Sequence, residues 1–155
     1  MPFRFRLNSV LRHREFKLQE ARSAFAAAES ARALVQSQIE RTRERLHEES
    51  ELLASEQETG INAARYLNFK NHLDVLERDL LKLQRELEKA ANEAELKRQE
   101  MIEWNKAVEL LESIETRDRE SHNYLVNRKD QKKLDEAAVF KDFRDRGPGG
   151  RREEE

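Results

Sequence analysis

The sequence contains no cysteine, which excludes disulfides, zinc–thiolate sites and thiol nucleophiles. No apolar run approaches the roughly 20 residues that a membrane-spanning helix requires. The N-terminal stretch MPFRFRLNSVLRHR is basic but lacks the apolar core of a secretory signal. We therefore expect a cytoplasmic protein that does not insert directly into a membrane.

Residues that break helices are also scarce. Proline occurs only at positions 2 and 148, and glycine only at positions 60, 147, 149 and 150. Residues 3–59 and 61–146 consequently lack a strong helix breaker. Within SEQETGINAARY, Gly60 is suited to end one helix, and either Thr59 or Asn62 is suited to cap the next.

An excess of charge of one sign is lacking too. The net charge is only −2, although 40% of the residues are charged. Such a balance creates no overall field that favours nucleic acid, so we expect no nucleic-acid partner. What is abundant is alanine, leucine, glutamate, lysine and arginine, the composition of a coiled coil or a long helix.

The apolar residues recur with a step of seven. In the first half, the two rows are Leu11, Leu18, Phe25, Arg32, Ile39, Leu46, Leu53 and Arg14, Ala21, Ala28, Val35, Thr42, Glu49. In the second half, they are Tyr66, Leu73, Leu80, Leu87, Ala94, Met101, Val108 and Phe69, Leu76, Leu83, Ala90, Lys97, Trp104, Leu111. A strict seven-residue repeat predicts a helix that packs along one partner with left-handed supercoiling.

The predicted fold is all-α, a long two-helix antiparallel coiled-coil hairpin whose second helix is longer than the first. We expect one hairpin over residues 1–146, with helices at about 6–58 and 62–143, a turn at about 59–62 and a disordered tail at 147–155. Tyr66 is expected to be a core residue close to the turn. A hairpin monomer and a dimer of long helices both remain open.

No catalytic constellation is present. The chain has no glycine-rich phosphate loop, and its four histidines are scattered without a pair at the helical spacing that metal ligation favours. A two-helix rod also provides no concave pocket. We therefore expect no catalytic residue, no metal, no cofactor and no enzymatic activity.

The charges are unevenly distributed along the chain. The first 14 residues carry four arginines and no acid, whereas residues 44–58 carry six glutamates and one arginine. This asymmetry indicates different partners at the open end and the turn end, or chance in a charge-rich chain. At the start, Phe3, Phe5 and Leu7 alternate with Arg4 and Arg6, which is typical of an extended arm or of a frayed terminus.

The segment NRKDQKKLDEAAVF, residues 127–140, lies beyond the point where the first helix can pair with the second. It combines a basic band with interleaved acids and a short apolar strip. One interpretation is a solvated overhang stabilised by pairs such as Lys132–Glu136. The other is a helix that docks in a groove or pore of a partner, because an unpartnered helix is marginal in water.

Three stretches resemble the flagellar FliJ family: FRFRLNSVLRHREFKLQEA, GINAARYLNFKNHLDVLE and NRKDQKKLDEAAVF. The last is the most specific, because it is similar to the family's C-terminal pattern N-R-x-D-Q-K-K-x-D-E. Length, predicted helices and the lack of cysteine fit along nearly the whole chain. Family members belong to the flagellar type III protein export apparatus.

The resemblance implies a coiled coil similar to the central stalk of rotary ATPases. Such a protein docks in or on the hexameric ring of the export ATPase FliI and promotes its assembly and activity. It also contacts the export gate protein FlhA and escorts substrate chaperones such as FlgN and FliT. Its implied place is the inner face of the cytoplasmic membrane at the flagellar base, with peripheral association.

Mapped onto this sequence, the resemblance implies two sets of binding residues. The ATPase-binding set is Phe5, Leu7, Leu11, Arg14, Asn127, Arg128, Asp130, Gln131, Lys132, Lys133, Leu134, Asp135 and Glu136. The set facing the gate or the chaperones is Gln38, Arg65, Asn68 and Leu76. Two alternatives remain: a generic structural coiled-coil scaffold, and the equivalent stalk protein of a virulence type III secretion system.

Overall fold

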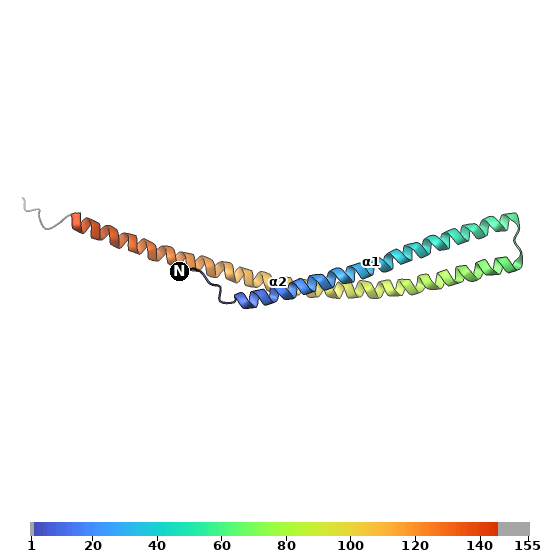
Figure 1. The fold of residues 1–155 in the computed structure, drawn as a ribbon, viewed down its shortest axis with the longest axis horizontal. Coiled ribbons are helices and arrows are strands. Elements are labelled where there is room, and N and C mark those ends of the chain that lie inside the picture. Colours follow the sequence, from blue (N-terminus) through green and yellow to red (C-terminus); the bar gives the residue numbers. More distant parts are fainter. Residues whose placement is uncertain (1, 146–155) are drawn as a thin grey trace, which may run out of the picture. The chain divides into compact units, whose positions relative to one another are not determined.

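The computed structural model describes residues 2–145 and is all-α. It contains two helices, α1 (Asn8–Thr59) and α2 (Ala63–Asp145), of 52 and 83 residues (Figure 1). No strand occurs in this part of the chain. The predicted fold class is confirmed, with the second helix the longer one. The tail predicted at 147–155 lies outside the described residues.

The described residues form two compact units. The helix-pair unit comprises residues 13–108, which include most of α1, the turn and the first part of α2. The terminal unit comprises residues 2–12 and 109–145. Helix α2 continues unbroken from one unit into the other.

The core of the helix-pair unit is the seam that the seven-residue rows predict. Its buried side chains are Leu18, Ala21, Ile39 and Leu53 from α1 and Leu76, Ala94 and Val108 from α2. Among the predicted row positions of this unit, only Arg32 and Tyr66 are exposed. The prediction of Tyr66 as a core residue is wrong, because 37% of its surface remains exposed in the first turn of α2.

The turn between the helices uses the residues that suit it. Gly60 has a φ of +95°, a conformation that costs little only for glycine. Asn62 Oδ1 accepts a hydrogen bond of 2.8 Å from the backbone N–H of Arg65, so Asn62 caps α2. Thr59, the other candidate cap, instead donates from Oγ1 to the Glu56 carbonyl at 3.1 Å.

The polar members of the rows are satisfied inside the helix-pair unit. Arg14 donates from Nη1 to the Ala107 carbonyl across the seam at 3.2 Å. Glu49 Oε1 lies 3.4 Å from Nδ1 of His72 on the opposite helix. These contacts place polar side chains at seam positions without leaving a buried polar atom unpaired in the described chain.

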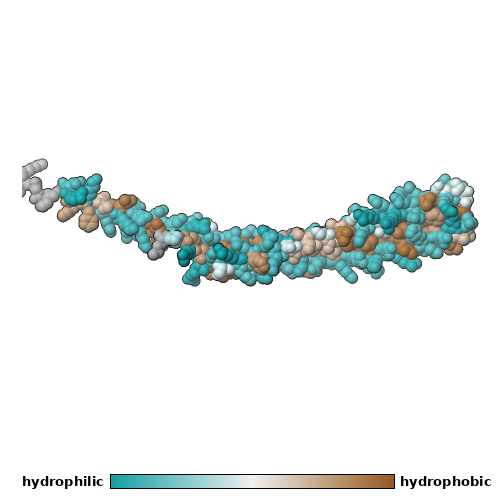
Figure 2. Space-filling model, in the orientation of Figure 1, coloured by the Kyte–Doolittle hydropathy of each residue, from teal (hydrophilic) through white to brown (hydrophobic). Residues whose placement is uncertain are grey.

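Figure 2 shows hydrophilic side chains over most of the visible face of the helix-pair unit, with apolar groups concentrated between the helices near the turn. The exposed apolar residues of this unit are single side chains, such as Leu34 and Leu96. Such a surface is normal for a water-exposed helix pair.

The terminal unit begins with a non-helical segment. Residues 2–5 have no regular structure and residues 6–7 form a turn, closed by a 3.3 Å hydrogen bond from Asn8 N to the Phe5 carbonyl. The only buried side chains of this unit, among described residues, are Leu11 and Leu111. Most of its α2 segment therefore lacks a covering partner.

Candidate docking surfaces

We call residues 2–7 the N-terminal strap. Its burial alternates residue by residue: Phe3, Phe5 and Leu7 are half-buried, whereas Arg4 and Arg6 are exposed. Over residues 2–5, before the turn at residues 6–7, this alternation is the pattern of an extended chain with one covered face. Of the two sequence interpretations, the structure favours an extended arm over a frayed terminus.

Phe3 anchors the strap on α2. Its ring lies 5.6 Å from the ring of His122, at an interplanar angle of 53°. The guanidinium of Arg119 lies 5.6 Å from the centroid of the same ring, within cation–π range. Arg119 also pairs with Glu115, one helical turn earlier, which fixes the guanidinium. The strap thus covers α2 as far as His122.

Beyond the strap, residues 123–145 form what we call the free helix. Every residue in it is exposed except Val126, which is half-buried. Its exposed large apolar side chains are Tyr124, Leu125, Leu134, Val139, Phe140 and Phe143. A helix of this length that leaves six large apolar side chains in water is poorly stabilised by itself.

The predicted signature residues 127–136 all lie on the free helix and are exposed. One ion pair forms among them, between Lys133 Nζ and Asp130 Oδ1 at 3.7 Å. The pair expected between Lys132 and Glu136 is not made within the described chain. An exposed pair of this kind contributes only tenths of a kcal/mol, so most of these charges are available to a partner.

The remaining predicted ATPase-binding residues have different environments. Phe5 and Leu7 are half-buried in the strap, and Leu11 is buried. Arg14 belongs to the helix-pair unit, where it holds the Ala107 carbonyl. Leu11 and Arg14 therefore stabilise helix pairing, and the exposed groups of this set lie on the free helix.

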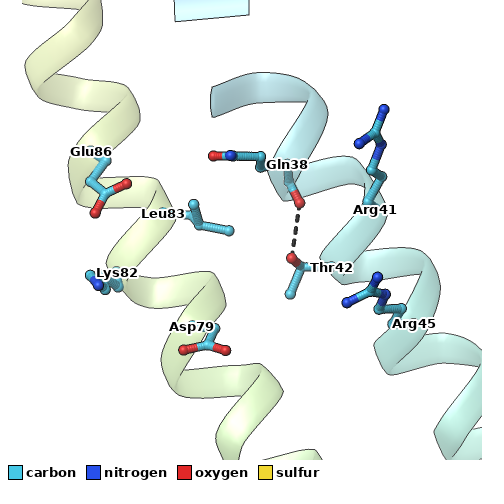
Figure 3. Close-up of a pocket in the computed structure, with 8 residues that line it drawn as sticks. All are labelled: Gln38, Arg41, Thr42, Arg45, Asp79, Lys82, Leu83 and Glu86. Atoms are coloured by element: carbon cyan, nitrogen blue, oxygen red, sulfur yellow. Dashed lines mark hydrogen bonds between the residues drawn. The ribbon is translucent and has the colours of Figure 1, made fainter. Parts of the chain in front are cut away.

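Gln38 lines a groove of about 470 Å³ between the helices of the helix-pair unit. Figure 3 shows Gln38 and Leu83 extending into the space between α1 and α2, with the Thr42 hydroxyl donating to the Gln38 carbonyl at 2.9 Å. Five charged side chains complete the lining: Arg41 and Arg45 from α1, and Asp79, Lys82 and Glu86 from α2. No ion pair joins them within the described chain.

Arg65 and Asn68 line a second, smaller depression of about 200 Å³ close to the turn, together with Glu49, Phe69 and His72. Arg65 also pairs with Glu56 across the turn. Leu76, by contrast, is buried in the seam with 7% of its surface exposed. Gln38, Arg65 and Asn68 are thus accessible to a partner, whereas Leu76 is part of the seam.

Sequence reasoning missed several residues of these surfaces. Val139 and Phe143 of the free helix were not singled out, although their exposure exceeds that of most apolar residues in the chain. Arg119 and His122, which hold Phe3, were also missed. The exposure of Val139 and Phe143 could have been predicted, because no seven-residue row continues past residue 111. The role of Arg119 and His122 could not, because it depends on contacts with Phe3, more than 100 positions away in the sequence.

The titratable groups form no catalytic arrangement in the described chain. The only shifted pair is Glu95 and Arg98 on α2: the hydrogen bond from Arg98 lowers the pKa of the Glu95 carboxyl, and the same bond raises the pKa of Arg98. Within residues 2–145, no cluster of acids and histidines is arranged to hold a metal ion. No helix there has the length and apolarity needed to cross a bilayer.

Two long helices, paired over the helix-pair unit and continued by the free helix, define a coiled-coil protein. A comparison with family models identifies the particular class. The chain belongs to the flagellar FliJ protein family, whose model matches residues 3–147. Membership makes it a component of flagellar type III protein export, and the family is a structural component of that export. No curated protein and no solved structure matches the chain.

Proposed function

We propose that this protein docks in or on the hexameric ring of the export ATPase FliI and promotes its assembly and activity. The observation that carries the proposal is the free helix, where residues 127–136, which resemble the family's C-terminal pattern, are all exposed and have no covering element in the described chain. A protein placed there acts on an enzyme without being one. Its site of action would be cytoplasmic, at the membrane-associated base of the flagellum.

The energetics of the free helix support a docking role. A single helix in water is marginal, and it gains stability when a groove or a pore covers it. Leu134 is 70% exposed and lies among charges of both signs, so a partner would bury an apolar anchor inside a polar rim. Phe140 and Phe143 add two aromatic anchors further along the helix.

We propose further that the helix-pair unit carries the contacts with the gate protein FlhA and with chaperones such as FlgN and FliT. Gln38 in the groove and Arg65 and Asn68 near the turn supply accessible polar groups for this role. The unpaired charges beside Gln38 favour a polar partner surface. Leu76 would contribute by holding α2 in register.

The experiment that tests ATPase docking compares two leucines of similar exposure. We expect Leu134→Asp to weaken binding to the cognate export ATPase at least tenfold, because it places a charge in the proposed apolar anchor. Leu96→Asp is the matched control, since Leu96 is 56% exposed on the helix-pair unit. Binding is measured by fluorescence anisotropy of labelled protein titrated with the ATPase, and folding by circular dichroism.

Equal affinities for the two variants would contradict docking through the free helix. If the unsubstituted protein does not bind the ATPase at all, a generic structural scaffold becomes the better account. The family match favours the flagellar machinery over the related virulence systems.

A further inference from the structure

We propose that the exposed side of the N-terminal strap is a second contact of the same docking interface. Arg4 and Arg6 would bind an acidic protein surface on the ATPase ring that presents at least two carboxylates. This inference rests on the proposed docking function and adds the chemistry of the partner surface.

One side of the strap is covered and the other is exposed to solvent. Phe3 packs on α2, where Arg119 and His122 lie 5.6 Å from its ring, and Phe5 and Leu7 are half-buried. Arg4 and Arg6, which lie between these residues, are exposed. Because Arg4 and Arg6 are only two positions apart and both exposed, the strap presents two guanidinium groups close together in the chain.

The charges of both arginines are unused within the described chain. Neither Arg4 nor Arg6 forms an ion pair there, although α2 carries Glu112, Asp118 and Glu120 in the same unit. The nearby Glu115 is already paired with Arg119. A guanidinium that is exposed and unpaired is suited to bidentate recognition of a carboxylate.

An acidic protein surface fits this arrangement better than a lipid bilayer or a nucleic acid. Either polyanion would present negative charge over a wide area and would face the acids of α2 as well as the arginines. Two arginines also release few counterions, so they give weak affinity for a polyanion. A local pair of carboxylates can engage Arg4 and Arg6 without meeting the neighbouring acids.

The test uses the full chain and the cognate export ATPase. The double variant Arg4→Gln/Arg6→Gln removes both charges from the strap and is expected to weaken binding roughly 2- to 30-fold, the combined effect of two exposed ion pairs. The matched control is Arg22→Gln/Arg43→Gln, which removes two exposed, unpaired arginines from the helix-pair unit. Raising the salt concentration should weaken ATPase binding by the unsubstituted protein more than ATPase binding by the strap variant.

A second variant tests whether the strap positions the arginines. Phe3→Ala removes the ring held by Arg119 and His122, and we expect it to cause part of the same loss while both charges remain. Phe3→Tyr retains the ring and should restore the affinity. Thermal unfolding followed by circular dichroism verifies that the variants keep the fold.

The outcomes separate this inference from the docking function. If the unsubstituted protein binds the ATPase and the strap variant binds equally well, the inference is wrong and docking stands. If the unsubstituted protein does not bind, both are wrong. A third outcome concerns polyanions. If the unsubstituted protein binds phosphatidylglycerol-containing vesicles or duplex DNA, and the strap variant loses that binding but still binds the ATPase equally well, the arginines recognise a polyanion and the inference is overturned.

Discussion

Ile39 is the residue on which helix pairing depends most directly. It is the most buried large side chain of the seam, with 1% of its surface exposed. Replacing a fully buried isoleucine by alanine removes apolar contacts and leaves a cavity, at a cost of about 2–5 kcal/mol. The higher helix propensity of alanine offsets a few tenths of a kcal/mol of this loss in stability. We therefore expect Ile39→Ala to lower the free energy of unfolding by about 2–4 kcal/mol.

The assay is urea unfolding followed by circular dichroism at the helical band, at fixed protein concentration. Ile39→Val should cost about 0.5–1.5 kcal/mol, because it removes a single methylene group. Leu34→Ala is the control: Leu34 is on the same helix but 61% exposed, so its effect should stay within about 0.5 kcal/mol. If Ile39→Ala and Leu34→Ala cost the same, burial along the predicted seam does not hold the helices together.

Three further changes test local features. Asn62→Ala removes the cap that accepts from Arg65 N and should cost about 0.5–2 kcal/mol in urea unfolding; an unchanged midpoint would contradict the cap. Gly60→Ala places a side chain at φ +95° and should cost about 1 kcal/mol in the same assay, whereas a stabilised protein would mean that the turn rearranges. Glu95 has a lowered pKa because Arg98 donates to it, so its contribution is present above the ordinary pKa of a glutamate and is lost as pH falls through the lowered value. Thermal unfolding of Glu95→Gln should therefore show a small decrease in Tm at neutral pH and none in strong acid, and a decrease that is equal at both pH values would refute the assignment.

The seam could be predicted from the sequence because periodicity is a local signal. Leu18, Ile39 and Leu53 recur at multiples of seven, and burial in a two-helix coiled coil follows that repeat directly. Tyr66 obeys the same repeat but is exposed, because it lies in the first turn of α2, where α1 has almost ended. The repeat does not show how close to the turn the two helices still cover one another.

The candidate docking surfaces were harder to predict. Exposure of the signature residues follows from the end of the apolar rows, and it was foreseen. The choice between an arm and a frayed terminus depended on Phe3 meeting His122, a contact between residues far apart in the chain. Leu76, which the resemblance assigns to the gate or chaperone set, also occupies a seam position and is buried there.

The most direct test of the central claim is the ATP turnover of the cognate export ATPase, measured where its ring is mostly dissociated. The full chain is compared with a chain that ends at His122, which keeps the strap contacts and removes the free helix. The account predicts that the full chain raises turnover and that the shortened chain does not. Equal stimulation by both chains, or no stimulation by either, would contradict the proposal that the free helix docks on the ring.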